Sequence, residues 1–231
     1  MSDFIWVEKY RPTTIDECIL PKSIKQTFQD FVDRGEIPNM LLSGPPGIGK
    51  TTVAKALCNQ LGADYYVING SDEGRFLDTV RTNAKNFAST VSLTSESKHK
   101  VIIIDEADNT TSDVQLLLRA SIEEFSKNCR FIFTCNYKNK IIDPLHSRCT
   151  VVDFSINKKD KPTIATQFFS RLTNILEQEK IDTDKKVVAQ LINQHFPDWR
   201  RVLNECQRYS VSGKIDSGIL AVFSDVAVND L

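Results

Sequence analysis

The chain has 231 residues, of which 41% are hydrophobic and 26% charged, and its formal net charge is −1. These values are typical of a globular protein with one large or two smaller domains, and they exclude a protein that coats nucleic acid through a general excess of Lys and Arg. No apolar run is long enough to span a bilayer, so we expect no membrane contact. The charged N-terminus is unlike a secretory signal, and the six cysteines are scattered and lack metal-site spacing. We therefore expect a cytoplasmic protein.

Strands and helices are expected to alternate in the first two thirds of the chain. Short apolar runs predict buried strands at residues 40–42, 65–68, 101–104, 131–134 and 151–154. Amphipathic patterns between them predict helices at residues 24–32, 52–61, 75–89 and 112–125, and the polar stretch 90–100 predicts a surface loop. This alternation predicts an α/β fold with a parallel sheet that helices cover on both faces.

The pattern changes near residue 156. Helical periodicity without a further buried strand continues at residues 163–179, 184–195, 198–210 and 216–224. In the first of these segments, one face is formed by Ile164, Phe168, Leu172 and Ile175. We therefore expect two domains, an α/β domain at residues 1–155 and a small all-helical domain at residues 156–231.

The segment GPPGIGKTT, residues 44–52, is the first candidate site. Gly44, four residues, and then Gly49-Lys50-Thr51 fit the phosphate loop G-x-x-x-x-G-K-[ST], and the motif lies between an expected strand and an expected helix. In such a loop, backbone N–H groups point at phosphate oxygens, the lysine reaches the β- and γ-phosphates, and the hydroxyl of Thr51 binds Mg²⁺. A chance glycine-rich turn is the alternative. The predicted nucleotide-binding residues of this segment are Gly44, Pro45, Pro46, Gly47, Ile48, Gly49, Lys50, Thr51 and Thr52.

Two acids follow the apolar run 101–104, where ligands bind in open α/β sheets. Asp105 is expected to hold Mg²⁺ directly or through water, and Glu106 to act as the general base that polarises the attacking water. A solvated acidic turn is the alternative. Residues 105–108 spell DEAD, which also marks a class of RNA helicases, but those enzymes need two nucleotide-binding-type lobes and this chain has room for one.

Two further polar residues are weaker candidates on spacing alone. Asn136 follows the expected strand 131–134, and with Thr134 it would end beside the phosphate loop and the acids if these strands are neighbours. It could then bond the γ-phosphate or orient the water, although an Asn after a strand is usually a turn former. Arg148, in HSRC at residues 146–149, is read most simply as a surface arginine.

Six segments occur along the chain in the following order: WVEKYRP, GPPGIGKTT, IIIDEAD, FTCN, SRC and FPDWRRVLN. In these segments and in their order, the chain resembles the AAA+ ATPase subunits of sliding-clamp loaders, such as replication factor C small subunits. The resemblance covers nearly the whole chain. Stretches such as RPTTIDECILP look most like the clamp-loader large subunits of T-even-type bacteriophages. It implies an AAA+ P-loop NTPase fold with a parallel sheet flanked by helices, followed by a helical lid.

The resemblance also implies roles for individual residues. The box expected to pack around adenine and ribose comprises Val7, Tyr10, Arg11 and Pro12. The implied catalytic residues are Lys50, Glu106, Asn136, Arg148 and Arg200. Among these, Asn136 is the first sensor, Arg148 is the arginine finger that reaches the ATP site of a neighbouring subunit, and Arg200 is the second sensor, with Arg201 as the alternative.

The implied activity is that of a DNA-dependent ATPase that uses ATP and Mg²⁺ to open a sliding clamp and load it on primer-template DNA in replication. The implied partners are the other clamp-loader subunits, in a hetero-pentamer, and the clamp. Arg75 and Arg81 are candidates for DNA contact, although a solvated helix face explains them equally well. The alternatives are another AAA+ machine, such as a helicase loader or branch-migration motor, or a non-hydrolysing structural subunit.

Three features depart from the family pattern. Ile48 stands where threonine is common, which we expect to have little effect because its side chain should point away from phosphate. Pro197 stands where glycine is usual, which puts the turn beside Arg200 in question. The family's C-terminal collar domain would begin near residue 231, so we expect it to be absent from this chain.

Overall fold

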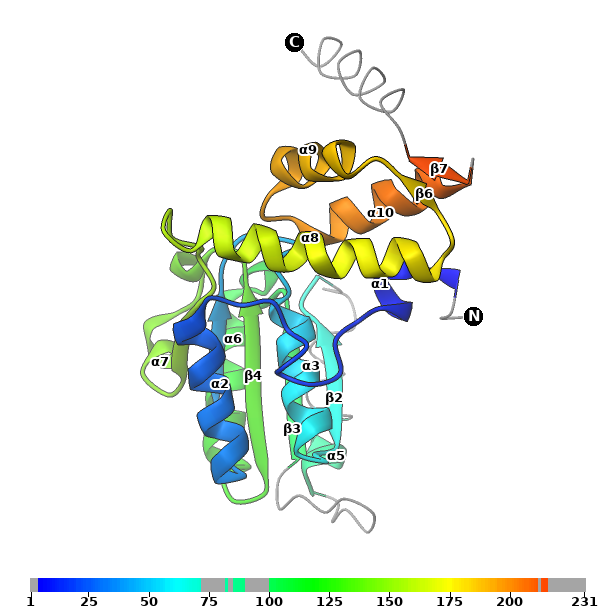
Figure 1. Cartoon of the computed structure of the whole chain (residues 1–231). Helices are drawn as coiled ribbons and strands as arrows, with labels where there is room; N and C mark the ends of the chain where they lie inside the picture. Colours follow the sequence, from blue (N-terminus) through cyan, green and yellow to red (C-terminus); the bar gives the residue numbers. More distant parts are fainter. Residues whose placement is uncertain (1–3, 72–81, 83–84, 90–99, 212, 216–231) are drawn as a thin grey trace. The chain divides into compact units, whose positions relative to one another are not determined.

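The structure, a computed structural model, describes residues 4–71, 82, 85–89, 100–211 and 213–215. The chain divides into two compact units, Pro12–Ser155 and a second unit formed by Met1–Arg11 with Ile156–Leu231. The expected domains placed residues 1–11 with the α/β part, whereas the structure groups them with the C-terminal part. Each unit is described by itself below (Figure 1).

A five-stranded parallel sheet forms the centre of the first unit. Its strands are β1 (Met40–Ser43), β2 (Tyr65–Asn69), β3 (Lys100–Asp105), β4 (Cys129–Cys135) and β5 (Thr150–Asp153). They are arranged in the order β2-β3-β4-β1-β5, and every neighbouring pair is parallel. The predicted parallel sheet is thereby confirmed, and the carboxyl ends of all its strands meet at one edge.

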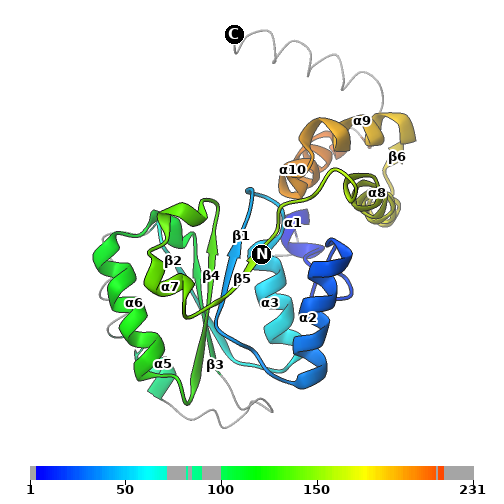
Figure 2. The same cartoon turned by 90° about the vertical axis from the view of Figure 1, so that its left-hand side faces the viewer.

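Helices cover both faces of this sheet (Figure 2). One face carries α2 (Lys22–Arg34) and α3 (Lys50–Gln60), and the other carries α5 (Lys85–Ser89), α6 (Ser112–Glu124) and α7 (Asp143–His146). Short 3₁₀ turns, η3 (Ala107–Asn109) and η4 (Lys138–Lys140), follow β3 and β4. Of the helix expected at residues 75–89 only α5 is described. The expected loop 90–100 lies outside the described residues except for its last residue, and so do Arg75 and Arg81.

The core of this unit explains why its central strands read as continuous apolar runs. Ile102 and Ile104 of β3 and Phe131 and Phe133 of β4 are at most 1% exposed, and they belong to one cluster with Leu118 of α6. The residues between them, such as Ile103 and Ile132, are equally buried because the opposite face is also covered. Burial on both faces removes the alternation that a half-exposed strand would show.

The second unit contains α1 (Trp6–Lys9), α8 (Lys161–Gln178), α9 (Lys185–His195) and α10 (Trp199–Ser210). The apolar face predicted for α8 is buried, and Phe168 stacks on Trp199 of α10 with ring centroids 4.2 Å apart. A pair of two-residue parallel strands, β6 (Asp182–Thr183) and β7 (Lys214–Ile215), was not expected, because so short a pair leaves no periodic pattern. The helix expected at residues 216–224 lies outside the described residues.

Hydrogen bonds hold the N-terminal helix to the rest of this unit. The Trp6 backbone N–H donates to Gln207 Oε1 at 2.9 Å. Lys9 Nζ and Tyr10 Oη both donate to Glu179 Oε1 at 2.6 Å, and the ammonium and hydroxyl lower the pKa of the Glu179 carboxyl. These contacts join segments about 170 and 200 residues apart in sequence, and they account for the grouping of residues 1–11 with the C-terminal part.

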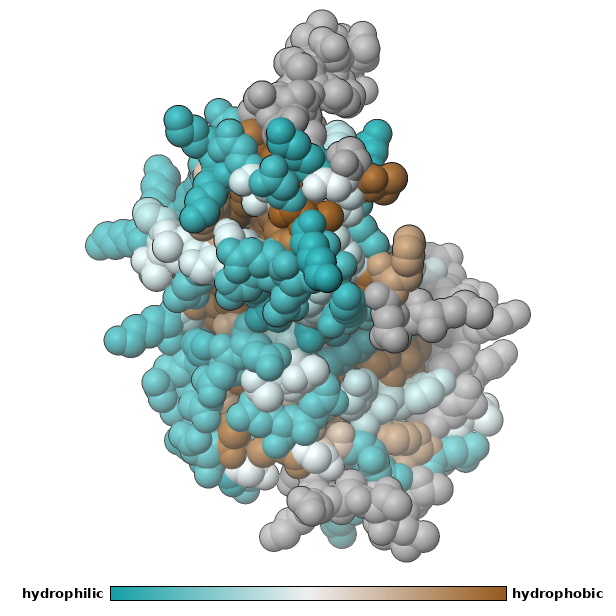
Figure 3. Space-filling view, turned by 45° about the vertical axis from the view of Figure 1, so that its right-hand side comes forward, coloured by the Kyte–Doolittle hydropathy of each residue, from teal (hydrophilic) through white to brown (hydrophobic). Residues whose placement is uncertain are grey.

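The surface is mostly hydrophilic on the face that Figure 3 presents, with apolar side chains in small separate groups. Within the described part of the chain, no helix has the length and apolar character needed to cross a membrane. All six cysteines are free thiols, and only Cys149 is not fully buried. Burial raises the pKa to about 12 for the thiols of Cys58, Cys129, Cys135, Cys149 and Cys206.

Replacing Phe133 by Ala tests the importance of this core. The ring is 1% exposed and lies in the central strand β4, so its removal should lower the free energy of unfolding by about 3–5 kcal/mol. Leu116→Ala is the matched control, because Leu116 is 48% exposed and its removal should change stability by no more than about 0.5 kcal/mol. Urea denaturation followed by circular dichroism measures both, and equal losses would contradict the assignment of the core.

Candidate active site

The phosphate loop connects β1 to α3 at the carboxyl edge of the sheet. Gly44, Gly47 and Gly49 have φ angles of 148°, 72° and 100°, values that residues with a side chain rarely adopt. The loop can therefore turn tightly and present its backbone to a ligand. Gly49 is the N-cap of α3 and has no side-chain cap, so the first N–H groups of the helix and the positive end of its dipole face the loop.

Lys50 is buried at the start of α3, with only 8% of its surface exposed. Its Nζ donates to the carbonyl oxygens of Gly44 at 2.7 Å and Pro45 at 2.8 Å, and to Asn136 Oδ1 at 2.9 Å. A buried ammonium is tolerated when protein acceptors replace water. The structure thus brings together Lys50, which begins α3 after the loop from β1, and Asn136, which follows β4, and the sheet order makes β1 and β4 direct neighbours.

Asp105, at the end of β3, is linked to α3 and to β4 through one carboxylate oxygen. Its Oδ1 accepts from Thr51 Oγ1 at 2.6 Å and from Thr134 Oγ1 at 2.5 Å. Thr134 in turn accepts from the backbone N–H of Glu106 at 3.1 Å. The hydroxyl of Thr134 therefore uses both its donor and its acceptor to fix the two acids, a function that the spacing of the sequence did not reveal.

Glu106 has a left-handed backbone conformation, with φ of 56°. This conformation is uncommon for a residue with a side chain, and such outliers occur often at functional sites. Glu106 Oε2 accepts hydrogen bonds from Ser71 Oγ and, at 3.2 Å, from Asn109 Nδ2. The carboxylate is thus oriented by the residues after β2 and by the turn η3.

Gly70 allows the chain to pass close to this turn. Its N–H donates to the Asp105 carbonyl at 2.7 Å, and a Cβ at this position would lie 2.5 Å from the carbonyl oxygen of Glu106. A side chain would therefore push the base away from its position. Gly70, Ser71 and Asn109 were not identified from the sequence, because their importance comes from contact between segments that the chain separates.

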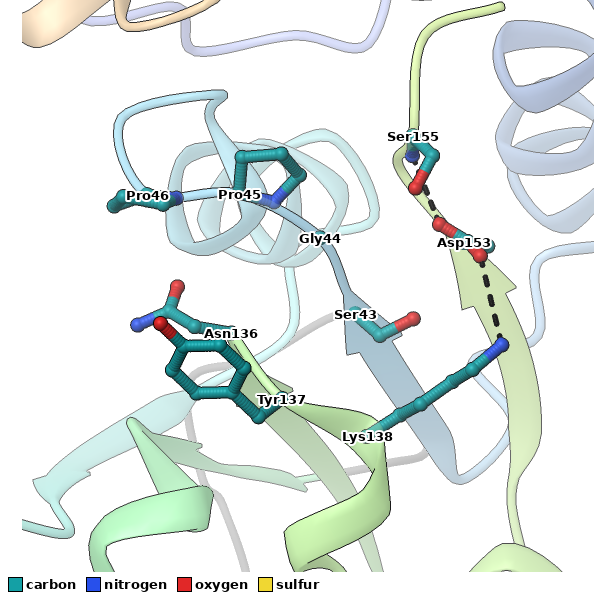
Figure 4. A pocket seen from close by; sticks show the side chains of 9 residues that line it. All are labelled: Ser43, Gly44, Pro45, Pro46, Asn136, Tyr137, Lys138, Asp153 and Ser155. Atoms are coloured by element: carbon teal, nitrogen blue, oxygen red, sulfur yellow. Dashed lines mark hydrogen bonds and ion pairs between the residues drawn. The ribbon is translucent and has the colours of Figure 1, made fainter.

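A pocket of ≈ 350 Å³ opens beside the phosphate loop (Figure 4). Its lining comes from the ends of three strands and the segments after them, and consists of Ser43, Gly44, Pro45, Pro46, Asn136, Tyr137, Lys138, Asp153 and Ser155. The Asn136 side chain is directed toward the loop of Pro45 and Pro46, and Lys138 Nζ faces Asp153 Oδ2 at 3.8 Å across the pocket. The pocket thus adjoins the Lys50–Asn136 contact.

The donors near Asp105 fit a magnesium ion bound together with phosphates. Mg²⁺ prefers oxygen ligands and is usually held by one or two side chains, with phosphates and waters completing the set. Thr51 Oγ1 and Asp105 Oδ1 supply two such oxygens side by side. Among the described residues, no group of three or more His, Cys, Asp or Glu side chains could hold a metal without phosphate ligands.

Arg148 is held within its own unit by α6 and α7. Its Nε and Nη2 donate to Glu123 Oε1 at 2.9 and 2.5 Å, and its Nη1 donates to the Pro144 carbonyl at 2.9 Å. The guanidinium lowers the pKa of the Glu123 carboxyl through hydrogen bonding and charge. None of the hydrogen bonds described for Arg148 goes to the phosphate loop.

The predicted adenine box and the two candidate second sensors belong to the second unit, apart from Pro12. Val7 and Tyr10 lie on and directly after α1, and Arg11 pairs with Glu8. Arg200 and Arg201 are exposed in the first turn of α10, whose N-cap Asp198 accepts from the Arg201 N–H at 3.0 Å. The bond before Pro197 is cis. The structure does not relate these residues to the phosphate loop.

The two parts of the chain match two known protein families. Residues 40–157 match the "ATPase family associated with various cellular activities (AAA)", and residues 160–221 match the "Sliding-clamp-loader large subunit, AAA+ ATPase lid domain".

Curated relatives and solved structures agree with these matches. The chain is 43% identical to the sliding-clamp-loader large subunit of Escherichia phage RB69 and 44% identical to that of Enterobacteria phage T4, in each case over 97% of this chain and 70% of the relative. It is 40% identical to the replication factor C small subunit of Methanocella arvoryzae, over 92% of this chain and 65% of the relative. A mutant of Thermotoga maritima RuvB has the same fold, with a TM-score of 0.70 at 19% identity, covering 94% of this chain and 73% of that structure.

Substitution of Thr134 tests the link between the two acids. Thr134→Val keeps the shape of the side chain but leaves the Glu106 N–H without its acceptor. It should lower the free energy of unfolding by about 1–3 kcal/mol. Thr134→Ser retains the hydroxyl and should restore most of this loss. Urea denaturation of the three proteins measures the effect, and a Val variant as stable as the wild type would contradict the bridging function of the hydroxyl.

Proposed function

Because the chain belongs to the AAA family of ATPases and to the sliding-clamp-loader large subunits within it, we propose that it uses ATP and Mg²⁺ to open a sliding clamp and load it on primer-template DNA. The hydrolysis of ATP and the membership of a clamp loader follow from the family. The dependence of hydrolysis on DNA, the magnesium ion and the assembly into a hetero-pentamer are parts of the proposal.

The observation that supports this proposal is the meeting of four side chains at one edge of the sheet. Lys50 donates directly to Asn136, and Thr134 links Asp105 to Glu106. Lysine and loop N–H groups can bind phosphate, and carboxylates can bind a cation and accept a proton. This is the chemistry that transfer of a phosphoryl group to water requires.

Each side chain then has a definite task. The phosphates of ATP replace the carbonyl and amide acceptors of Lys50, and the Lys50 ammonium neutralises part of their charge. Thr51 and Asp105 would hold Mg²⁺, which neutralises the β- and γ-phosphate oxygens when it is bound. Glu106, oriented by Ser71 and Asn109, accepts a proton as water attacks the γ-phosphorus and the bond to the bridging oxygen breaks, so that ADP leaves and phosphate is formed. Asn136 bonds the γ-phosphate or orients that water.

Arg148 completes the ATP site of a neighbouring copy in this proposal. Its guanidinium is held by Glu123 and Pro144 in its own unit, so it must exchange at least part of these contacts for phosphate oxygens. An arginine supplied in this way is worth about 10³–10⁵ in rate in related phosphoryl transfers. A second candidate function, a structural subunit without hydrolysis, is disfavoured by the complete set of Lys50, Asp105, Glu106 and Arg148.

The other predicted residues enter the proposal through the family pattern alone. Val7, Tyr10, Arg11 and Pro12 would contact adenine and ribose, Arg200 would sense the γ-phosphate from the lid, with Arg201 as its alternative, and Arg75 and Arg81 would contact DNA. The phage relatives also lead us to propose that the protein works in the cytoplasm of a host cell, with other loader subunits and the clamp as its partners.

The substitution Glu106→Gln tests the catalytic base. The amide retains the shape of the carboxylate but cannot take a proton, so ATP binding should be kept while kcat falls by about 10²–10⁴-fold. Phosphate release with and without clamp and primed DNA, together with the Kd of a fluorescent ATP analogue, measures both quantities. Asp113→Asn, at an exposed acid on α6, is the control. Turnover near the wild-type value in the Glu106 variant would rule out the assignment.

A mixing experiment tests the action of Arg148 on a neighbour. Arg148→Ala should bind ATP normally but not support hydrolysis at the adjacent site, whereas Lys50→Ala should lose ATP binding but keep a working Arg148. Each variant alone should be inactive. A mixture at concentrations where copies associate should regain hydrolysis, because one variant supplies the phosphate loop and the other supplies the arginine. A mixture as inactive as its components would argue against this assignment.

A further inference from the structure

Asp108 is a buried acid that the proposed mechanism does not use. It lies in the turn η3, two residues after Glu106, and only 6% of its surface is exposed. Its Oδ2 accepts from the backbone N–H groups of Asn136 at 3.1 Å and Tyr137 at 3.0 Å. Its Oδ1 is buried without a hydrogen-bond partner among the described residues. Burying an ionised carboxylate is costly unless its bonds compensate, so this position requires an explanation.

The two N–H groups belong to the segment that leaves the sheet at the tip of β4. Strand β4 ends at Cys135, which pairs with Ser43, the last residue of β1. Asn136 and Tyr137 follow this last pair, and their N–H groups are turned toward η3 rather than toward β1. The acceptor that fixes the backbone at this point is therefore the carboxylate of Asp108. Hydrogen bonds to a charged acceptor are about twice as strong as neutral ones.

This fixed backbone carries the Asn136 side chain. Asn136 Oδ1 accepts from Lys50 Nζ at 2.9 Å, and Figure 4 shows the side chain directed toward the phosphate loop. A second cross-link, from the Glu106 N–H to Thr134 Oγ1, joins the same turn to the same strand. The turn that carries Glu106 and the strand tip that carries Asn136 are thus joined by two separate hydrogen-bonded links.

We propose that Asp108 is a positioning residue for ATP hydrolysis. Its carboxylate holds the Asn136 amide in a fixed position relative to Lys50 and to the turn that carries Glu106. The inference rests on the proposed function, because it acts through the proposed task of Asn136. Asp108 itself touches neither phosphate nor water in the reaction. A displacement of about 1 Å can cost about 10²-fold in rate, so losing this carboxylate should be costly although no reacting group is removed.

A double-mutant cycle separates positioning from simple stabilisation. The proteins are the full chain, Asp108→Ala, Asn136→Ala and the double variant, and Asp113→Ala is the control on an exposed acid. We measure kcat for phosphate release and the ratio of the Kd for ADP to that for a non-hydrolysable ATP analogue. Asp108→Ala and Asn136→Ala should each lower kcat by about 10–100-fold and lower the ratio. The double variant should be no worse than Asn136→Ala alone.

The variant Asp108→Asn keeps the test decisive if Asp108→Ala does not fold. Its amide oxygen can accept from the same two N–H groups without a charge, so kcat should fall by only about 3-fold. That loss should disappear when Asn136 is already Ala. The inference would be overturned if the loss of kcat caused by an Asp108 variant multiplied with the loss caused by Asn136→Ala. Full kcat in Asp108→Ala would also overturn it.

The same measurements separate this inference from the proposed function. If the wild-type chain did not distinguish ATP from ADP, or if Asn136→Ala behaved as the wild type, the task of Asn136 would be wrong and the inference would fall with it. If Asn136→Ala were impaired and Asp108→Ala were not, only the inference would fail.

Discussion

The buried ammonium group of Lys50 is the constraint on which the arrangement of the site depends. A charged amine that is 8% exposed needs acceptors from the protein, since an isolated buried charge is very costly. The carbonyls of Gly44 and Pro45 and the amide oxygen of Asn136 provide them. The position of one side chain therefore depends on the glycine conformations of the loop and on the pairing of β1 with β4. A triphosphate can replace these neutral acceptors with charged oxygens, which bind an ammonium group more strongly. The site can therefore bind its ligand although Lys50 already has hydrogen-bond partners.

The strand order distributes the site over three consecutive strand pairs of the sheet. Beyond the ends of β4 and β1, Asn136 contacts Lys50 of α3, and between β3 and β4, Thr134 joins the two acids. Between β2 and β3, the Gly70 N–H bonds the Asp105 carbonyl. Each contact depends on the parallel register of its pair, which brings the carboxyl ends to one level. A shift in register at any of these pairs would separate groups that have to act together.

Local patterns predicted the strands, the phosphate loop and the acid pair, because apolar runs and loop spacing are properties of short segments. Asn136 was identified on the condition that its strand is a neighbour of the other two, and the order β2-β3-β4-β1-β5 meets that condition. Ser71, Thr134 and Asp108 could not be given their contacts from the sequence, because each depends on a partner about 28 to 35 residues away. The grouping of the N-terminal box with the lid was missed for the same reason, since Lys9 and Glu179 are 170 residues apart.

The buried thiols have a practical consequence for chemical labelling. Alkylating reagents attack the thiolate, and burial raises the pKa of five thiols to about 12. Four of these five thiols, all except the partly exposed Cys149, are also buried and therefore inaccessible to reagents. We therefore expect the folded chain to react slowly with maleimides at neutral pH. A cysteine introduced at an exposed position reacts selectively in this background, with no native residue removed. Slow modification of Cys58 or Cys206 then measures how often the corresponding unit opens, so the two units each carry a natural reporter of their own local unfolding.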